Sequence, residues 1–168
     1  MRNSGQVITI DFFVAVTAIT ILIAFVVLSW NQAVEEFRSR EMRTEMTVST
    51  INLADSLVKS QGDPSSWENI SEINNINSLG LVVEDHILDS SKLIAFVGLG
   101  ESNLKKILGI QNYNFYFKVS DGKKTVNLAD IKLENGSYPN SSASAVINSQ
   151  RIALLKNTPV YLDFVLWR

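Results

Sequence analysis

The single histidine of the chain, His86, stands among acidic residues, in the run Glu84-Asp85-His86 with Asp89 close behind. An imidazole beside carboxylates can bind a metal ion or transfer protons near neutral pH. A zinc site would need further histidine or cysteine ligands, and the sequence has neither. A serine hydrolase would need a G-x-S-x-G nucleophile elbow, which the sequence also lacks. We therefore predict no catalytic residue, no metal site and no cofactor, and interpret His86 as a loop residue.

Three asparagines match the glycan acceptor pattern Asn-x-Ser/Thr, namely Asn69, Asn135 and Asn140. They are candidate glycosylation sites if this part of the chain is exported. In a chain this rich in Asn and Ser, chance matches are equally expected. Charge offers little further chemistry, because 15 Lys and Arg balance 17 Asp and Glu without a basic stripe. We therefore predict no nucleic-acid partner.

The dominant feature is an apolar run of 19 residues without a charge, from Phe12 to Trp30. As a helix rising about 1.5 Å per residue, it crosses most of a hydrocarbon core of about 30 Å. It is longer than the apolar part of a removable secretory signal and is not followed by an A-x-A cleavage site. We expect it to be a retained transmembrane helix with Trp30 at the headgroups. Basic residues lie mainly after it, which by itself would place the C-terminal part inside the cell.

Helical signals continue beyond the apolar run. No Pro or Gly occurs between Asn31 and Ser60, and apolar residues recur three to five positions apart from Met46 onward. This spacing predicts one helix from about Thr9 to about Lys59, with Asn31 as the place for a bend, whose last part packs on a core. Small residues at Thr17, Thr20 and Ala24 allow close helix packing, although tolerated small residues are the commoner explanation.

The remainder predicts two short helices followed by antiparallel strands. Gly62 and Asp63-Pro64 end the long helix, and residues 68–80 are expected to form a loop. The two helices are expected to be capped by Asp89 or Ser90 and by Ser102. A strand over 113–119 is expected to turn at Asp121-Gly122 and to pair with a second strand over 124–127. Polar loops at Asn135-Gly136 and 138–142 precede a second hairpin, in which strands 143–155 and 160–167 are joined by residues 156–159. Val160, Leu162, Phe164 and Leu166 would share the buried face of the last strand. We therefore predict an α+β fold in which the C-terminal half of the long helix packs on an antiparallel sheet.

The chain resembles archaeal type IV pilin-like proteins with class III signal peptides. The resemblance lies in Ser4-Gly5-Gln6-Val7, followed by Asp11-Phe12-Phe13 and the apolar run. Two other segments are similar as well: 54–68 at the end of the long helix, and the C-terminal hairpin from Arg151 to Trp167. The start of this chain departs from the family in having Asp11 sixth after the cut, where an acidic residue is often fifth.

The resemblance implies that a class III prepilin peptidase cuts between Gly5 and Gln6. It divides the chain into a leader (1–5), a transmembrane and assembly helix (6–30), a helical continuation (31–61) and an extracytoplasmic globular domain (62–168). Its partners would be membrane lipid and copies of itself or other pilin-like subunits. Asp11 would then set the register of assembly by meeting the new amino group of a neighbour, whereas by itself it is an interfacial residue favoured by the helix dipole.

The resulting expectation is a structural protein without enzymatic activity, a subunit or minor component of an archaeal pilus-like surface filament that assembles through its apolar helix. The alternative is a permanently anchored extracytoplasmic sensor or binding domain that does not polymerise.

Overall fold

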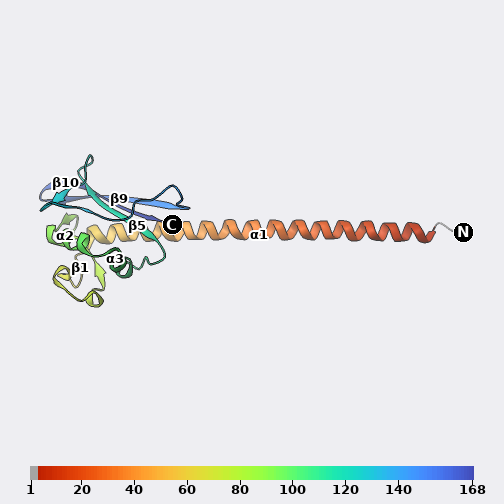
Figure 1. Cartoon of the computed structure of the whole chain (residues 1–168), viewed down its shortest axis with the longest axis horizontal. Coiled ribbons are helices and arrows are strands. Elements are labelled where there is room, and N and C mark those ends of the chain that lie inside the picture. The colour runs from red at the N-terminus through yellow and green to blue at the C-terminus, as the bar shows by residue number, and fades with distance from the viewer. Residues whose placement is uncertain (1–3) are drawn as a thin grey trace. The chain divides into compact units, whose positions relative to one another are not determined.

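The computed structural model describes residues 4–168, with side chains described from Ile10 onward. The chain divides into two compact units, Met1–Thr44 and Glu45–Arg168. Helix α1, Ser4–Lys59, supplies the described part of the first unit and enters the second (Figure 1). It ends at the expected residue but begins before the expected Thr9, and its helical backbone is uninterrupted at Asn31. Of the leader, residues 1–3 lie outside the described residues.

The last part of α1 forms the centre of the second unit. Met46, Thr50, Ala54, Leu57 and Val58 are fully buried there. Their spacing of three or four residues places them on one side of the helix, as the sequence predicted. Thr50 avoids an unpaired hydroxyl by donating a hydrogen bond of 2.6 Å to the carbonyl of Met46. Burial of a large apolar side chain stabilises the fold by about 1.5–3 kcal/mol, which makes this stretch a structural core.

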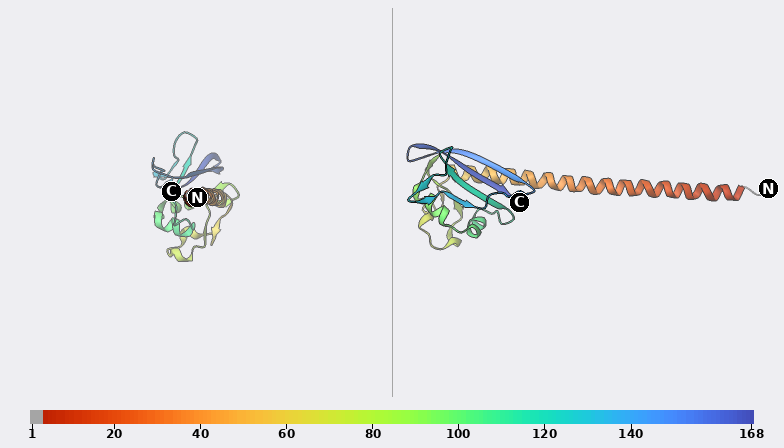
Figure 2. Two further views of the ribbon diagram at one scale, coloured as in Figure 1. Left: turned by 90° about the vertical axis from the view of Figure 1, so that its right-hand side faces the viewer. Right: turned by 45° about the horizontal axis from the view of Figure 1, so that its top comes forward.

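A six-stranded sheet covers one side of this stretch, and short helices lie on the other (Figure 2). The strand order is β3-β4-β9-β10-β5-β8, and every pairing is antiparallel except β4 with β9. The chain is therefore α+β with a largely antiparallel sheet, as predicted. The strands of this sheet are β3 (Val82–Glu84), β4 (Ile87–Leu88), β5 (Asn114–Ser120), β8 (Glu134–Gly136), β9 (Val146–Leu155) and β10 (Thr158–Trp167). Two small sheets pair β1 (Gly62–Asp63) with β2 (Ser78–Leu79) and β6 (Asn127–Leu128) with β7 (Ile131–Lys132).

The predicted buried face of the last strand is confirmed. Val160, Leu162, Phe164 and Leu166 of β10 are all buried. Phe164 stacks on Phe115 of β5 with ring centroids 6.0 Å apart. Strands β9 and β10 form the expected C-terminal hairpin, with a turn of only two residues. Lys156 and Asn157 in this turn both have positive φ, the geometry of two-residue hairpin turns that match strand twist.

The expected hairpin at Asp121-Gly122 is only partly correct. The chain turns there, with Asp121 accepting hydrogen bonds from two turn amides, but the returning segment makes one isolated bridge, between Ser120 and Thr125. Strand β8 pairs with β5 beyond that bridge, so the prediction of Asn135-Gly136 as a polar loop was wrong. A β-carbon on Gly136 would come 2.2 Å from the carbonyl oxygen of Phe115, so a glycine sits in this strand because of close backbone approach.

The middle of the chain contains α2 (Ser90–Gly98) and α3 (Glu101–Ile107). Asp89 caps α2 as predicted, since its carboxylate accepts hydrogen bonds from the backbone N–H groups of Ser91 and Lys92. The prediction of Ser102 as the cap of α3 was wrong, because α3 already begins at Glu101 after Gly100.

The segment 68–80, predicted as a loop, contains short regular pieces. It includes most of the 3₁₀ turn η1 (Trp67–Asn69), the turn η2 (Ile73–Asn75) and β2. Gly62 has a positive φ, but it lies in β1, after α1 has ended at Lys59. A β-carbon on Gly62 would come 2.5 Å from the ring of Trp67, whose indole N–H donates to the carbonyl of Gly80. Trp67 is thus a buried anchor for this segment.

Candidate membrane and assembly surface

His86 has the surroundings of a structural turn residue. It lies between β3 and β4 with φ 62°, and Nδ1 is 2.8 Å from the carboxylate of neighbouring Asp85. Its backbone N–H donates to Val58 and its carbonyl accepts from Leu154, so the turn links α1 to β9. Among the described residues, no three His, Asp or Glu side chains come together in a way that could hold a metal ion. The geometry therefore favours the loop interpretation of His86.

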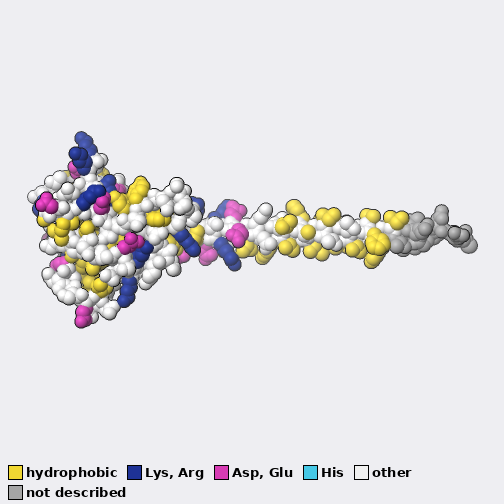
Figure 3. Space-filling view, in the orientation of Figure 1, with side chains coloured by type: hydrophobic (Ala, Val, Ile, Leu, Met, Phe, Trp, Pro, Cys, Tyr) yellow, Lys and Arg dark blue, Asp and Glu magenta, His cyan; other side chains and the backbone are white. Residues whose placement is uncertain are grey.

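The apolar part of α1 is instead the most unusual surface of the described chain. Its large apolar side chains from Ile10 to Trp30 are between 44% and 68% exposed. One described helix, within Ile10–Lys59, is long and apolar enough to cross a membrane, and no residue of its most apolar 18-residue stretch is buried. Hydrophobic side chains lie along both visible edges of this stretch (Figure 3). A helix that is apolar on all sides requires lipid or other apolar helices around it.

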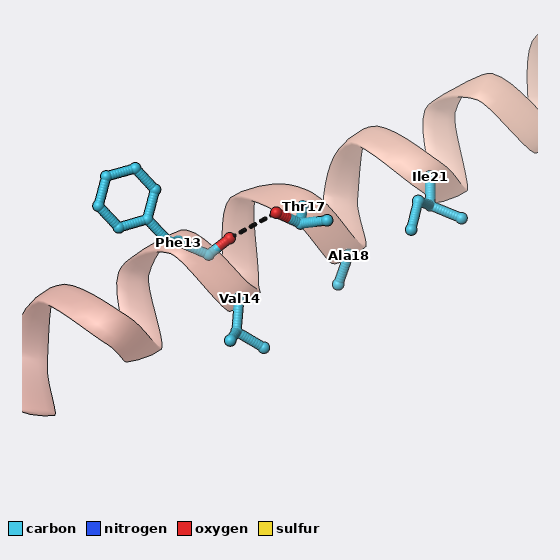
Figure 4. Close-up of a pocket in the computed structure, with 5 residues that line it drawn as sticks. All are labelled: Phe13, Val14, Thr17, Ala18 and Ile21. Carbon is cyan, nitrogen blue, oxygen red and sulfur yellow. Dashed lines mark hydrogen bonds between the residues drawn. The ribbon is translucent and has the colours of Figure 1, made fainter.

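The threonines of this stretch satisfy their hydroxyl groups within the helix. Thr17 donates a hydrogen bond of 2.8 Å to the carbonyl of Phe13 (Figure 4), and Thr20 donates one of 2.8 Å to that of Val16. This pairing lowers the cost of placing a hydroxyl in hydrocarbon. The hydroxyl hydrogen of each threonine is thereby bonded to the backbone of its own helix. A neighbouring helix would therefore meet short side chains whose oxygens can still accept a hydrogen bond.

A shallow groove follows one side of the helix. It is lined by Phe13, Val14, Thr17, Ala18 and Ile21 (Figure 4). Of the predicted packing residues Thr17, Thr20 and Ala24, the groove contains Thr17 alone. The small Ala18 lies between the larger Val14 and Ile21, one turn from the former, on one side of the helix.

A second groove lies further along the first unit and was also missed. Its lining residues are Trp30, Ala33, Val34, Phe37, Arg38 and Glu41. Trp30 and Phe37 are each more than two-thirds exposed, and they are seven residues apart. The i, i+3, i+4, i+7 spacing of this set marks one stripe of a helix. The apolar surface therefore continues beyond the uncharged run, on one side of the helix.

Charged groups begin where the uncharged run ends. Arg40 and Glu36 form an exposed ion pair of 2.6 Å across one turn of α1. Such an exposed pair contributes at most about 0.5 kcal/mol, so it defines the polar end of the run more than it stabilises the helix. At the other end, Asp11 is an exposed residue of α1. Gly5 and Gln6 lie in the first turn of α1, and the side chain of Gln6 is outside the described part.

The three candidate glycan acceptors differ in how free their side chains are. The amide of Asn135 donates to the carbonyls of Val97 and Leu99 at 2.9 and 3.0 Å, which caps the end of α2. A glycan on that nitrogen would disrupt this cap. Asn69 and Asn140 are exposed, and Asn140 accepts hydrogen bonds from Ser142 through its oxygen only. Asn69 and Asn140 are thus the two acceptors that this structure accommodates.

Two polar contacts that the sequence did not reveal hold the last part of α1 in place. The guanidinium of Arg151 on β9 bonds the carboxylate of Asp55, and Lys59 pairs with the same carboxylate at 3.1 Å. Arg151, followed by Lys59, lowers the pKa of Asp55 below its usual value. The buried ammonium of Lys92 donates to the carbonyls of Gln61 and Val82, which ties α2 to the segment after α1. Both contacts join elements of the second unit.

Comparison with protein-family models, with curated proteins and with solved structures found no match to this chain.

Proposed function

We propose that this chain is a single-span membrane protein that serves as a structural subunit, major or minor, of an archaeal type IV pilus-like filament. The observation that carries the proposal is the uncharged run from Phe12 to Trp30, whose large apolar side chains are exposed on all sides of one helix. Such a surface is stable in lipid, or in a bundle where sister helices replace the lipid.

Three further features support assembly over simple anchoring. The start of the chain, from Ser4 to Phe13, resembles the processing site and first helical turns of class III pilin-like proteins. The grooves at Ala18 and at Ala33–Val34 give a neighbouring helix a place to pack. The second unit has a core of its own, so it can be displayed while the first part of α1 is engaged by neighbours.

The proposed maturation is a cut between Gly5 and Gln6 by a class III prepilin peptidase on the cytoplasmic side. The second unit would then lie outside the cell, with Asn69 and Asn140 open to glycosylation. Asp11 would meet the new amino group of an adjacent subunit, where opposite charges attract strongly because the surroundings have a low dielectric constant.

The test is mass spectrometry of the N-terminus of the chain recovered from sheared surface filaments and from washed membranes of its native cell. We expect a chain beginning at Gln6 in the filament fraction. A Gly5→Leu variant should keep its original N-terminus and remain in the membrane fraction.

The competing function is a tethered sensor or binding domain. It would be supported by a chain that keeps its original N-terminus and occurs only in membranes. A water-soluble native chain beginning after Trp30 would overturn both functions, because the apolar helix would then be a discarded segment.

A further inference from the structure

The free edge of β9 is the longest unpaired edge in the described part of the six-stranded sheet. β9 pairs with β10 along its whole length, but with β4 only at Leu154 and Leu155. The outer strands β3 and β8 have three residues each. Natural proteins usually protect a sheet edge by short strands, charges or proline. Residues 146–153 contain no proline and a single charge, Arg151, which is bound to Asp55 of α1.

Backbone groups at this edge point in a known direction. The N–H of Leu154 donates to His86 on the β4 side, whereas Ala145 exchanges hydrogen bonds with Arg168 on the β10 side. Because these directions alternate along a strand, even-numbered residues aim their N–H and C=O groups away from β10. These residues are Val146, Asn148, Gln150 and Ile152, and the side chains of all four are exposed.

The four residues form a near palindrome about Ser149. Among these four residues, the pair nearest Ser149 (Asn148 and Gln150) carries amide side chains, and the outer pair (Val146 and Ile152) carries β-branched apolar side chains. We propose that two copies of this chain join through β9, antiparallel and about a two-fold axis at Ser149, into one continuous sheet. In this register Asn148 faces Gln150 of the second copy, and Val146 faces Ile152.

This register pairs groups of the correct kind and direction. The even-numbered facing pairs each exchange two backbone hydrogen bonds, on the order of eight in all, and the odd-numbered pairs between them exchange none. On the outer face, apolar β-branched side chains meet each other, and amide side chains, which both donate and accept hydrogen bonds, meet each other. On the inner face, Ile147 lies opposite Arg151 of the second copy. The carbonyl of Gln150 already accepts a hydrogen bond from Arg151, and a carbonyl oxygen has a second lone pair for the new one. If the register shifted by one residue, even-numbered residues of one copy would lie opposite odd-numbered residues of the other. The N–H and C=O groups of the odd-numbered residues point toward β10, so the backbone hydrogen bonds between the copies would be lost.

Ser149 supplies an independent observation. Its side chain is only 5% exposed, and its hydroxyl has no hydrogen-bond partner among the described residues. A buried hydroxyl without a hydrogen-bond partner destabilises a fold. On the two-fold axis, Ser149 faces its own copy in a non-hydrogen-bonded pair, where the two Cα atoms are about 4.5 Å apart. The two hydroxyls can then bond each other, as Ser and Thr pairs do across strands.

The pairing is distinct from helix stacking in one filament, because it joins two copies of opposite orientation. β9 and the Glu45–Lys59 part of α1 run side by side in the same direction. Arg151 contacts Asp55, and three residues later in both elements Leu154 is linked to Val58 by backbone hydrogen bonds to His86. A two-fold axis perpendicular to the sheet reverses both. The two copies therefore have Glu45–Lys59 stretches that run in opposite directions, whereas neighbouring helices of one filament would be parallel.

Single cysteines test the proposal in the full chain, which has no cysteine of its own. The protein is purified in detergent, with micelles in large excess so that two chains rarely share one micelle. Under mild oxidation, Ser149→Cys should form a disulfide-linked dimer at least about tenfold faster than Asn148→Cys or the turn variant Lys123→Cys. The Cα separation across the axis suits a disulfide at 149, while at 148 it exceeds the limit of about 7 Å.

A charge variant and its matched control test the register. Adding Asn148→Lys and Gln150→Lys to Ser149→Cys places like charges opposite each other and should abolish fast linking. Exchanging the amides instead (Asn148→Gln with Gln150→Asn) preserves the palindrome and should preserve linking. If Ser149→Cys fails to fold, a mixture of Val146→Cys and Ile152→Cys chains should link while neither links alone, since both positions are exposed.

Linking that follows this pattern supports the β9 pairing. Equal rates at all positions, or no linking at 149 and none in the mixture, overturn it. Fast linking that survives the lysine pair would also overturn it, because the dimer would then use another surface.

Discussion

The two units differ in the exposure of the large apolar side chains of α1. In the first unit, the large apolar residues of α1 from Ile10 to Trp30 are exposed, and in the second unit Met46, Leu57 and Val58 of the same helix are fully buried. Within the second unit, a sheet and short helices of the same chain lie against the helix. The second unit therefore has a core formed by one chain, while the described apolar side chains of the first unit are exposed.

The largest expected effect tests the core of the second unit. Phe164→Ala should lower the free energy of unfolding by about 3–5 kcal/mol, because it empties a fully buried site stacked on Phe115. The measurement is denaturant unfolding followed by near-ultraviolet circular dichroism in detergent. Phe25→Ala removes the same ring from a side chain that is 68% exposed and should leave this transition unchanged. Equal losses in the two variants would contradict the division into two units.

The next effect tests the surroundings of the first unit. Ala18→Arg puts a charge into the middle of the uncharged run and should cost about 2.5–3.5 kcal/mol of membrane insertion. The measurement is the fraction of chain that resists alkaline extraction from membranes. Ala33→Arg places the same charge just beyond the run and should leave that fraction nearly unchanged. Equal retention of both variants would indicate that residues 12–30 do not cross the hydrocarbon core.

A smaller effect concerns a polar contact inside the second unit. Asn135→Ala removes the hydrogen bonds that cap α2 and leaves the carbonyls of Val97 and Leu99 without that partner. We expect a loss of about 1–2 kcal/mol in the free energy of unfolding. Asn140→Ala, at an exposed asparagine, is the matched control and should lose less than about 0.5 kcal/mol. A glycan found on Asn135 in the native protein would contradict the structural role of this amide.

How far sequence predicts structure also differs between the two units. The long helix, the Asp89 cap and the buried face of β10 were predictable, because each depends on a local pattern of spacing or capping. The place of β8 was not, since its pairing with β5 depends on long-range register and on backbone approach at Gly136. The Asp55–Arg151 contact joins residues far apart in sequence and has no local signal.

The surface in the first unit was predictable in kind but not in detail. A long uncharged apolar run predicts an apolar helix, so the stretch Phe12–Trp30 could be identified from the sequence alone. The groove at Ala18 depends on which side chains are short relative to their neighbours, and the choice of Thr17, Thr20 and Ala24 captured only Thr17 of it. The near palindrome about Ser149 suggests a pairing of two copies only once the structure shows the free edge of β9 and the unpaired hydroxyl of Ser149.

The smallest effect is the pH dependence of the contact between α1 and β9. Arg151, and to a lesser extent Lys59, lowers the pKa of Asp55 in the folded chain below the ordinary value of 3.8. A lowered folded-state pKa stabilises the fold above the unfolded-state pKa, and this contribution disappears as the pH falls through the folded-state value. Because the carboxylate is about one-third exposed, the contribution at pH 7 is at most about 1 kcal/mol.

Arg151→Met should therefore destabilise the second unit by up to about 1 kcal/mol at pH 7 and have less effect below the folded-state pKa of Asp55. Urea unfolding of both chains at a series of pH values between 2 and 7 measures the difference. Lys59→Met is the matched control, and its effect should be smaller because the lysine is about half exposed. A difference between Arg151→Met and the unaltered chain that stays constant down to pH 2 would show that the arginine stabilises β9 by packing and not by its charge. The last part of α1 would then be held to the sheet by apolar contacts and by the backbone hydrogen bonds through His86, without a contribution from the ion pair.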